Sequence, residues 1–278
     1  MNKVFIFAST AIVAVSATPA MAQEANPEFF DGFYVAGSLS ADVPTQGGDG
    51  IVFDTDQDGT FDNTVRTVAG SNAFVGFCDG RANGRTPAAG CGSDDEDFGY
   101  AIKLGYDRRI NDGPFVGGLL IEGSKSDATE FSNGFSSTPA SYTIARQVDY
   151  AISGRGRVGF SPGDGRGLFY VTGGISYADI ERDFFTTNTA NSFDLQGDDK
   201  VWGGQIGGGA EVMFLNNISF GVEYLYSSYE DDDSFVAVGP GTAGATNPFL
   251  IESGGTNLRG STTDFNIHSF RATVGFHF

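Results

Sequence analysis

The chain ends in the stretch SFRATVGFHF, residues 269–278, and its alternation of side chains decides the fold. Side chains of a β-strand point alternately to opposite faces of the sheet. One face is polar and includes Arg271 and His277. The other face is apolar and carries Phe270, Ala272, Val274, Phe276 and Phe278. An apolar outer face and a polar inner face are what a barrel of strands needs when lipid surrounds it.

The first 22 residues have the three parts of a secretory signal peptide. Lys3 supplies a positive charge, residues 4–15 form a short apolar stretch, and Ala20-Met21-Ala22 has the A-x-A form of a cleavage site. The apolar stretch is too short to cross a bilayer as a helix, and no stretch of about 18 apolar residues follows it. We therefore predict a signal peptide over residues 1–22 and an exported domain over residues 23–278.

The composition narrows the classes of function. The chain of 278 residues has 41 glycines and 26 phenylalanines, with a mean hydropathy of −0.13. So much phenylalanine is unusual in a soluble acidic protein, and it is expected where aromatic side chains face lipid and ring the membrane interfaces. The net charge of −19 argues against nucleic acid as a partner, because nucleic acid binds to basic patches.

The alternation of the last strand recurs in seven earlier segments. Most are close to the ~9–11 residues that a tilted membrane strand needs. We predict these strands over residues 33–40, 98–106, 115–123, 148–160, 168–177, 201–214 and 218–226.

The connections between these strands alternate in length. Residues 110–114, 161–166 and 215–217 are short and rich in the Asn, Asp, Gly and Pro of tight turns. The long, polar connections are residues 41–97, 124–146, 178–200 and 227–263. A soluble β-sandwich is the alternative, but it needs neither this regular alternation nor aromatic residues gathered at both strand ends. The sequence predicts an all-β fold: an eight-stranded antiparallel transmembrane β-barrel with short periplasmic turns and long extracellular loops.

The polar faces of the predicted strands carry charges of both signs. An unpaired charge in a closed interior is very costly, so we predict interior ion pairs. Because an eight-stranded barrel is just wide enough to be filled by side chains, these pairs should plug the interior. The residues predicted to pair are Lys103, Glu122, Arg155, Arg157, Glu211, Glu223 and Arg271.

Three stretches carry a resemblance to a known family: residues 33–37 at the start of the first strand, the glycine-rich hairpin over residues 203–226, and residues 274–278 at the end. Here the chain resembles the small eight-stranded outer-membrane proteins of the opacity-like and outer-membrane-protein-A-like type, porin-family barrels that include surface antigens of alphaproteobacteria. The resemblance implies a location in the outer membrane of a Gram-negative bacterium. It also implies that the barrel assembly machinery reads the terminal strand through Phe270, Phe276 and Phe278.

The only two cysteines are Cys78 and Cys91. In an exported protein with two thiols, a disulfide is the expected state. It would stabilise the fold by about 3 kcal/mol in the chain-entropy treatment. A catalytic thiol would need a nearby histidine, and this segment of the sequence contains none.

The segment DTDQDGTFD, residues 54–62, matches the first part of an EF-hand-type calcium loop. The twelfth position is Val65, where a bidentate glutamate is expected, so binding would be weak. A solvated acidic turn is the alternative. We predict no cofactor other than a weakly bound calcium ion, with oxygen ligands from Asp54, Asp56, Asp58, Thr60 and Asp62.

Two acidic runs, residues 94–97 and 230–233, flank the predicted outer end of the barrel. One interpretation is a solvated rim that keeps the loops soluble. The sharper one is that divalent cations bridge these carboxylates to phosphates of lipopolysaccharide. Outer-membrane lipid and lipopolysaccharide are therefore the expected partners, and the sequence leaves the oligomeric state open.

The motifs that resemble catalytic sites lack the required parts. Residues 159–163 fit G-x-S-x-G, but Pro162 has no backbone N–H for an oxyanion hole. Adjacent strand residues such as His268 and Ser269 face opposite sides and cannot form a dyad. We predict no enzyme but a structural outer-membrane protein with exposed acidic loops, serving envelope integrity or surface interaction. The alternatives are a small-solute or ion pore and an adhesin, a surface antigen for host interaction carried by residues 41–97.

Overall fold

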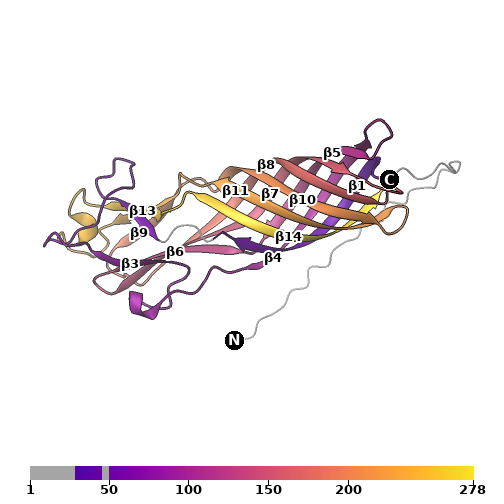
Figure 1. Ribbon diagram of the computed structural model, residues 1–278. Coiled ribbons are helices and arrows are strands. Elements are labelled where there is room, and N and C mark those ends of the chain that lie inside the picture. The colour runs from indigo at the N-terminus through magenta and orange to yellow at the C-terminus, as the bar shows by residue number, and fades with distance from the viewer. Residues whose placement is uncertain (1–28, 46–49) are drawn as a thin grey trace.

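A computed structural model describes residues 29–45 and 50–278, so the predicted signal peptide lies outside the described residues. Eight antiparallel strands form a closed barrel in the order β7-β5-β4-β1-β14-β11-β10-β8, and β8 pairs back with β7 (Figure 1). This confirms the predicted all-β, eight-stranded barrel. The strands are β1 (Gly32–Pro44), β4 (Asp97–Arg109), β5 (Phe115–Ser126), β7 (Ala140–Phe160), β8 (Gly167–Thr186), β10 (Lys200–Met213), β11 (Ile218–Glu230) and β14 (Asp264–His277).

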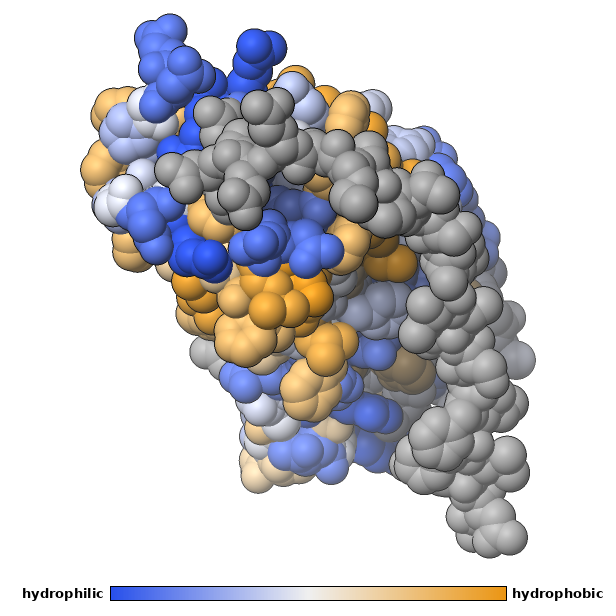
Figure 2. Space-filling model, turned by 90° about the vertical axis from the view of Figure 1, so that its right-hand side faces the viewer, coloured by the Kyte–Doolittle hydropathy of each residue, from blue (hydrophilic) through white to orange (hydrophobic). Residues whose placement is uncertain are grey.

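The alternation of side chains separates the two faces of the wall. In β4, Ile102 and Leu104 are exposed on the outside, while Lys103 between them is buried inside. In β14, Phe270, Val274 and Phe276 are likewise exposed on the outside. Figure 2, which faces the end of the barrel that carries the C-terminus, shows apolar side chains gathered between hydrophilic ones. The outside therefore suits lipid and the inside suits paired charge.

The three short connections lie at one end of the barrel, beside the C-terminus (Figure 1). In the turn between β4 and β5, Asn111 and Asp112 have φ of 55° and 53°, the left-handed region that these residue types tolerate. Large aromatic side chains are exposed at this end, including Phe115, Phe169 and Phe214. Such a girdle marks one of the two membrane interfaces.

The long connections are not solvated polar loops, which corrects the sequence-based expectation. Their described residues form six further strands and two short 3-10 helices, η1 (Pro87–Ala89) and η2 (Pro248–Leu250). No helix among the described residues is long and apolar enough to cross a membrane. The six strands are β2 (Ile51–Asp54), β3 (Phe74–Asp79), β6 (Thr129–Ser136), β9 (Ser192–Gln196), β12 (Phe235–Gly239) and β13 (Thr256–Gly260).

We call these six strands, their connections and the outer halves of β7 and β8 the cap (Figure 1). In the cap, β3 and β6 extend the barrel sheet beside β7, and a separate sheet has the order β2-β13-β12-β9. Buried apolar side chains from both sheets pack together as a hydrophobic core. Its central members are Phe53, Phe74, Tyr142, Val236, Phe249 and Leu258.

The length of β7 and β8 explains why the cap can form. These strands have 21 and 20 residues, about twice what a membrane crossing needs. Residues 140–146 of β7 are buried on both faces, because they pack against the cap core on one side and against other cap residues on the opposite side. The barrel wall thus continues beyond the membrane as one layer of a packed unit.

The cap core yields a prediction about local stability. Leu258→Ala removes a side chain that is 0% exposed at the centre of this core. We expect the cap to lose about 2–5 kcal/mol of stability, while the barrel stays folded. Protease cleavage of the cap in increasing urea measures the first effect, and heat-modifiable migration on a denaturing gel reports the barrel.

The matched control for that experiment is Val68→Ala, since Val68 is 69% exposed on the same cap. It should leave the protease resistance unchanged. Equal sensitivity of the two variants would contradict a packed cap core.

Candidate functional site

The centre of the barrel holds a buried network of five charged side chains. Arg271 Nη1 lies 2.7 Å from Glu122 Oε1, and Arg155 also pairs with Glu122. Lys103 Nζ lies 2.9 Å from Glu223 Oε1, and Arg155 Nη1 lies 3.3 Å from the same oxygen. The structure therefore brings five of the seven predicted interior residues into one group, which we call the central network.

Strand register explains how distant residues meet in the central network. Lys103 on β4 stands directly opposite Glu122 on β5, and Glu223 on β11 stands opposite Arg271 on β14. Arg155 reaches across the interior from β7 and contacts both carboxylates. A shift of one residue in any of these pairings would turn the charges toward the lipid.

The other two predicted interior residues, Arg157 and Glu211, form a second layer nearer the short turns. Arg157 Nε donates to Asp107 Oδ1 at 2.8 Å, and its Nη1 lies 3.1 Å from Glu211 Oε2. The ring of Tyr34 lies under the guanidinium, 4.5 Å from its central carbon. Tyr170 joins the layers, since its hydroxyl donates to Glu223 at 3.0 Å while its ring contacts Arg157.

The charges of the two layers offset each other. The central network has three cations and two carboxylates, whereas the second layer has one arginine and two carboxylates. With His277 neutral, the formal charges therefore sum to zero. Paired and mutually hydrogen-bonded charges are the form in which a buried interior tolerates ionised groups.

The outer part of the barrel interior is apolar, which sequence reasoning missed. Five barrel strands contribute to a buried cluster that lies between the central network and the cap. Its members are Val148, Ala151, Ala178, Ile180, Val201, Tyr229, Phe265 and Ile267. The interior is thus closed by packed hydrocarbon as well as by ion pairs.

The opposite end of the interior is closed by residues that precede β1. Phe29 and Phe30 are buried against Leu168 and Met213. Arg109 holds this segment in place, since its Nε donates to the Phe29 carbonyl at 2.8 Å. Sequence reasoning missed this contact as well, because nothing in the alternation of the strands refers to the residues before them.

A wall that is apolar outside and a sealed, charge-paired interior are the features of a membrane barrel. In agreement, the family model described as "Outer membrane protein beta-barrel domain" matches residues 8–278. The chain belongs to this family. It is thus a β-barrel of the Gram-negative outer membrane, and Phe270, Phe276 and Phe278 of its last strand are exposed on the outer wall.

The solved structure of one outer-membrane barrel has the same fold. The outer membrane protein OprG of Pseudomonas aeruginosa superposes with a TM-score of 0.52 at 12% identity, covering 92% of this chain and 100% of its own. Neisserial surface protein A (NspA) gives a TM-score of 0.37 at 10% identity, covering 89% of this chain and 98% of its own. The likeness to OprG shows the fold alone. No curated protein shows significant sequence similarity to the chain.

At the base of the cap of this outer-membrane barrel, a third group of charges was not foreseen from the sequence. Arg146 Nη2 lies 2.7 Å from Glu130 Oε2, and Arg182 Nη2 lies 2.7 Å from Asp231 Oδ1. Arg146 also contacts Asp231, at 3.3 Å. Asp231 is only 4% exposed, so it is not part of a solvated rim.

Asp94, in the other acidic run, is likewise not part of a solvated rim. It is buried, and its Oδ1 accepts a hydrogen bond from the Phe131 backbone N–H at 2.8 Å. Burial raises the pKa of Asp94 to about 6 and, against the opposing effect of Arg146, that of Glu130 to about 7. Both carboxyls therefore accept a proton far more readily than exposed carboxyls do.

Cys78 and Cys91 form the predicted disulfide, which confirms that expectation. The bond joins β3 to the segment that follows η1, and the amide of Asn133 on β6 lies beside both sulfur atoms. It closes the outermost edge of the barrel sheet, where β3 has no further strand beside it among the described residues. A covalent link at a sheet edge limits the fraying of such a strand.

The predicted calcium loop is partly assembled. Carboxylate oxygens of Asp54, Asp56 and Asp58 all lie within 4.8 Å of one another. Asp54 is buried, and its side chain accepts hydrogen bonds from the backbone N–H groups of Asp58 and Gly59 at 3.1 and 3.2 Å. These carboxylates suit a hard cation such as calcium.

The remaining members of the loop depart from an EF-hand. Asp62 is not in the carboxylate group, and its Oδ1 accepts a hydrogen bond from the Asn63 amide at 3.2 Å instead. Thr60 donates its backbone N–H to Asp58 at 2.7 Å. Val65, at the twelfth position, is buried in the cap core. Three carboxylates therefore lie close enough together to share one cation, while the Thr60 carbonyl oxygen and calcium binding itself stay predictions.

The central network yields a prediction about stability. Glu122→Gln would remove one of the two carboxylates that pair with Lys103, Arg155 and Arg271, and Glu223 would remain as the other. We expect a loss of about 3–5 kcal/mol in the free energy of unfolding, because buried charges lose their partner. Urea unfolding in lipid vesicles, followed by the fluorescence of the single tryptophan, measures it.

Asp149→Asn provides the matched control. Asp149 pairs with Lys125 at 2.6 Å, but the two side chains are 44% and 35% exposed. Its loss should cost about 1 kcal/mol or less, because solvent screens exposed pairs. An equal loss in the two variants would contradict a special role for the interior charges.

The acidic loop yields a prediction about calcium. We expect heat of binding in isothermal titration of the whole protein at submillimolar to millimolar calcium, and its loss in Asp56→Asn, which removes one clustered carboxylate. Asp62→Asn should bind as the wild type does, because Asp62 lies outside the cluster. Absence of heat at millimolar calcium would remove the calcium site.

Proposed function

We propose that the protein is a closed structural barrel that anchors the folded cap at the cell surface, serving envelope integrity or surface interaction rather than catalysis. The observation that carries this proposal is the filled interior. Beneath the cap, the apolar cluster, the central network, the second charged layer and the buried Phe29 and Phe30 follow one another. A solute would have to displace all four.

The small size of a cavity inside the barrel supports the same proposal. Between the central network and the apolar cluster there is a cavity of about 20 Å³, lined by Asp42, Gln205 and Arg271 among others. Such a volume holds about one water molecule. A structural anchor needs no larger space, whereas a pore for solutes needs a continuous one.

The surroundings of His277 support a function other than catalysis. His277 Nε2 lies 2.9 Å from Ser219 Oγ and 3.1 Å from Glu211 Oε1. A catalytic triad needs the acid on the other ring nitrogen, where it orients the base, and it needs a serine that substrate can reach. Ser219 is buried and donates to Glu211 itself. This group is therefore better explained as part of the interior packing.

We also propose that the exposed rim carboxylates contact lipopolysaccharide through divalent cations. The supporting observation is that Asp95, Glu96, Asp97, Glu230 and Asp232 are exposed close to where the strands leave the apolar belt. Carboxylates and phosphates repel each other unless cations lie between them.

For assembly, the outward aromatic side chains of β14 support recognition by the barrel assembly machinery.

The finer family relationship belongs to this proposal too. We infer an opacity-like or outer-membrane-protein-A-like barrel of alphaproteobacterial type, on the strength of the eight strands, the short turns and the terminal aromatic strand. The folded cap supports a role in surface contact, as expected of a surface antigen or adhesin, since a packed unit presents a fixed surface to a partner.

Planar-bilayer recording tests the closed barrel. We expect the purified protein to give little or no steady current, because paired charges and packed side chains fill the interior. A wider barrel with an open interior, inserted in the same way, verifies that insertion is efficient. Stable single-channel steps from the wild-type protein would contradict the proposal and favour the alternative function, a small-solute or ion pore.

A further inference from the structure

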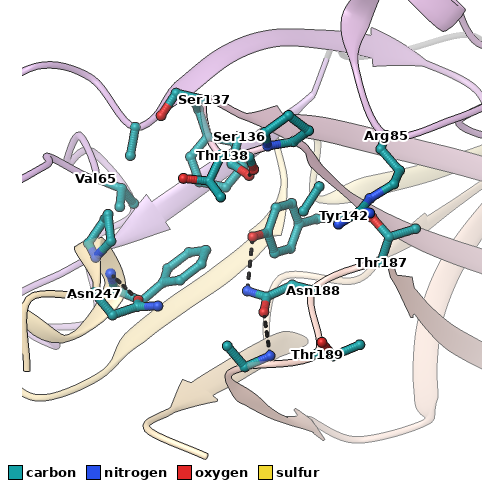
Figure 3. Close-up of a pocket in the computed structure, with 17 residues that line it drawn as sticks. Val65, Arg85, Ser136, Ser137, Thr138, Tyr142, Thr187, Asn188, Thr189 and Asn247 are labelled. Atoms are coloured by element: carbon teal, nitrogen blue, oxygen red, sulfur yellow. Dashed lines mark hydrogen bonds between the residues drawn. The ribbon is translucent and has the colours of Figure 1, made fainter. Parts of the chain in front are cut away.

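A cavity of about 250 Å³ lies in the cap, at a place where all four long connections meet (Figure 3). Phe74, Ser137, Asn188 and Phe249 come from the connections after β1, β5, β8 and β11, respectively, and all four line it. Sites built from several connections on a rigid scaffold are where barrels most often carry binding functions. The volume is below that of a site for a drug-sized ligand, so the occupant would be small.

The floor of the cavity is an aromatic corner. The ring centroids of Phe74 and Tyr142 lie 5.2 Å apart, and those of Tyr142 and Phe249 lie 5.6 Å apart, in tilted and edge-to-face arrangements. All three side chains belong to the cap core and are buried. Such rings fix the walls of the cavity and offer apolar contact to a ring placed against them.

The amides around the cavity are already engaged with one another. Asn188 Nδ2 donates to the Tyr142 hydroxyl at 3.0 Å, and its Oδ1 accepts from the Ala190 backbone N–H at 2.8 Å (Figure 3). Asn247 Nδ2 donates to Asn191 Oδ1 at 2.9 Å, and its Oδ1 accepts from the Phe249 backbone. These amides therefore cannot bind a ligand without losing a hydrogen bond within the cap.

Arg85 is the one charged residue in the described lining of the cavity, and it is exposed. Its side chain extends toward Tyr142 and Thr187 at the edge of the cavity (Figure 3). It makes no hydrogen bond or ion pair with the part of the chain that the structure describes. By contrast, Arg66 donates to the Gly70 carbonyl, and Arg81 lies over the ring of Phe185. An unpaired guanidinium beside an apolar cavity favours a carboxylate, which it can bind with two hydrogen bonds.

We propose that this cavity binds a small organic carboxylate with one apolar ring. The ring lies against Phe74, Tyr142 and Phe249, and the carboxylate lies on Arg85. The site goes beyond the proposed anchoring function and is independent of it, since a barrel that conducts and one that does not could each carry it.

The test uses the full-length protein in detergent, with phenylacetate as the probe and the uncharged phenylacetamide for comparison. Isothermal titration should show saturable binding of one phenylacetate per chain. We expect phenylacetamide to bind about 10-fold more weakly, because it cannot form the charge-assisted hydrogen bonds.

Two variants assign the binding to this cavity. Arg85→Gln should lower the affinity for phenylacetate about 10-fold and leave that for phenylacetamide unchanged. Arg81→Gln is the matched control, because it removes a charge from the same connection but outside the cavity, and it should bind as the wild type does. Thr138→Trp places a large side chain at an exposed position of the lining and should abolish binding of both probes.

The outcomes that overturn the proposal are distinct. Absence of saturable phenylacetate binding at millimolar concentration refutes the site. Equal affinity for the acid and the amide, or no effect of Arg85→Gln, refutes the carboxylate. Binding that persists in Thr138→Trp places the probe elsewhere, for example in the detergent. Unaltered thermal unfolding of the variants excludes misfolding as the cause of a loss.

Discussion

The structure depends on one constraint: a charge enclosed by a wall with lipid outside must have its partner inside the same wall. Lys103, Arg155 and Arg271 meet this constraint through Glu122 and Glu223. These five residues come from five of the eight barrel strands, so satisfying them sets the register of most of the barrel. The same register places the aromatic and branched residues on the outside, where lipid replaces water. One physical requirement thus orders both faces of the wall.

The cap follows from continuing β7 and β8 past the membrane. Beyond the barrel, the face of β7 that carries Val148 of the interior cluster continues outward, and it would meet water unless it is covered. Tyr142 and Ile144 are covered by the second sheet, whose Val236 and Leu258 pack against them in the cap core. The disulfide links the outermost edge of the barrel sheet in the cap, and the buried pair of Arg182 and Asp231 lies at the base of the cap. The long connections therefore fold because they carry the apolar residues needed to form a core.

Much of this could be predicted from the sequence, and the reason is periodicity. A half-buried strand with a period of two, as in β4 and β14, reveals its faces directly, and the short turns reveal the order of the strands. The interior charges follow, because Lys103 or Arg271 has to point inward once the outer face is known. These predictions use only local pattern and the cost of exposing charge to lipid.

The cap could not be predicted in the same way. Residues 140–146 of β7 are buried on both faces, so they show no alternation, and β9 and β12 are only five residues long. Asp231 and Asp94 lie in acidic runs whose composition predicts exposure to solvent. Only tertiary contacts bury these two side chains. The pairing of Arg182 with Asp231 and the contact of Arg85 with the aromatic corner likewise join connections that are distant in the sequence.

The most direct test of the account is the accessibility of the barrel interior to water-soluble reagents. Ser176 is 1% exposed and faces the interior beside the central network, where it accepts a hydrogen bond from Ser153. A charged thiol reagent should leave Ser176→Cys unmodified in the folded protein and modify it after unfolding, while Thr138→Cys on the cap reacts at once. Rapid modification of the folded Ser176→Cys protein would show an open, hydrated interior and contradict the sealed barrel.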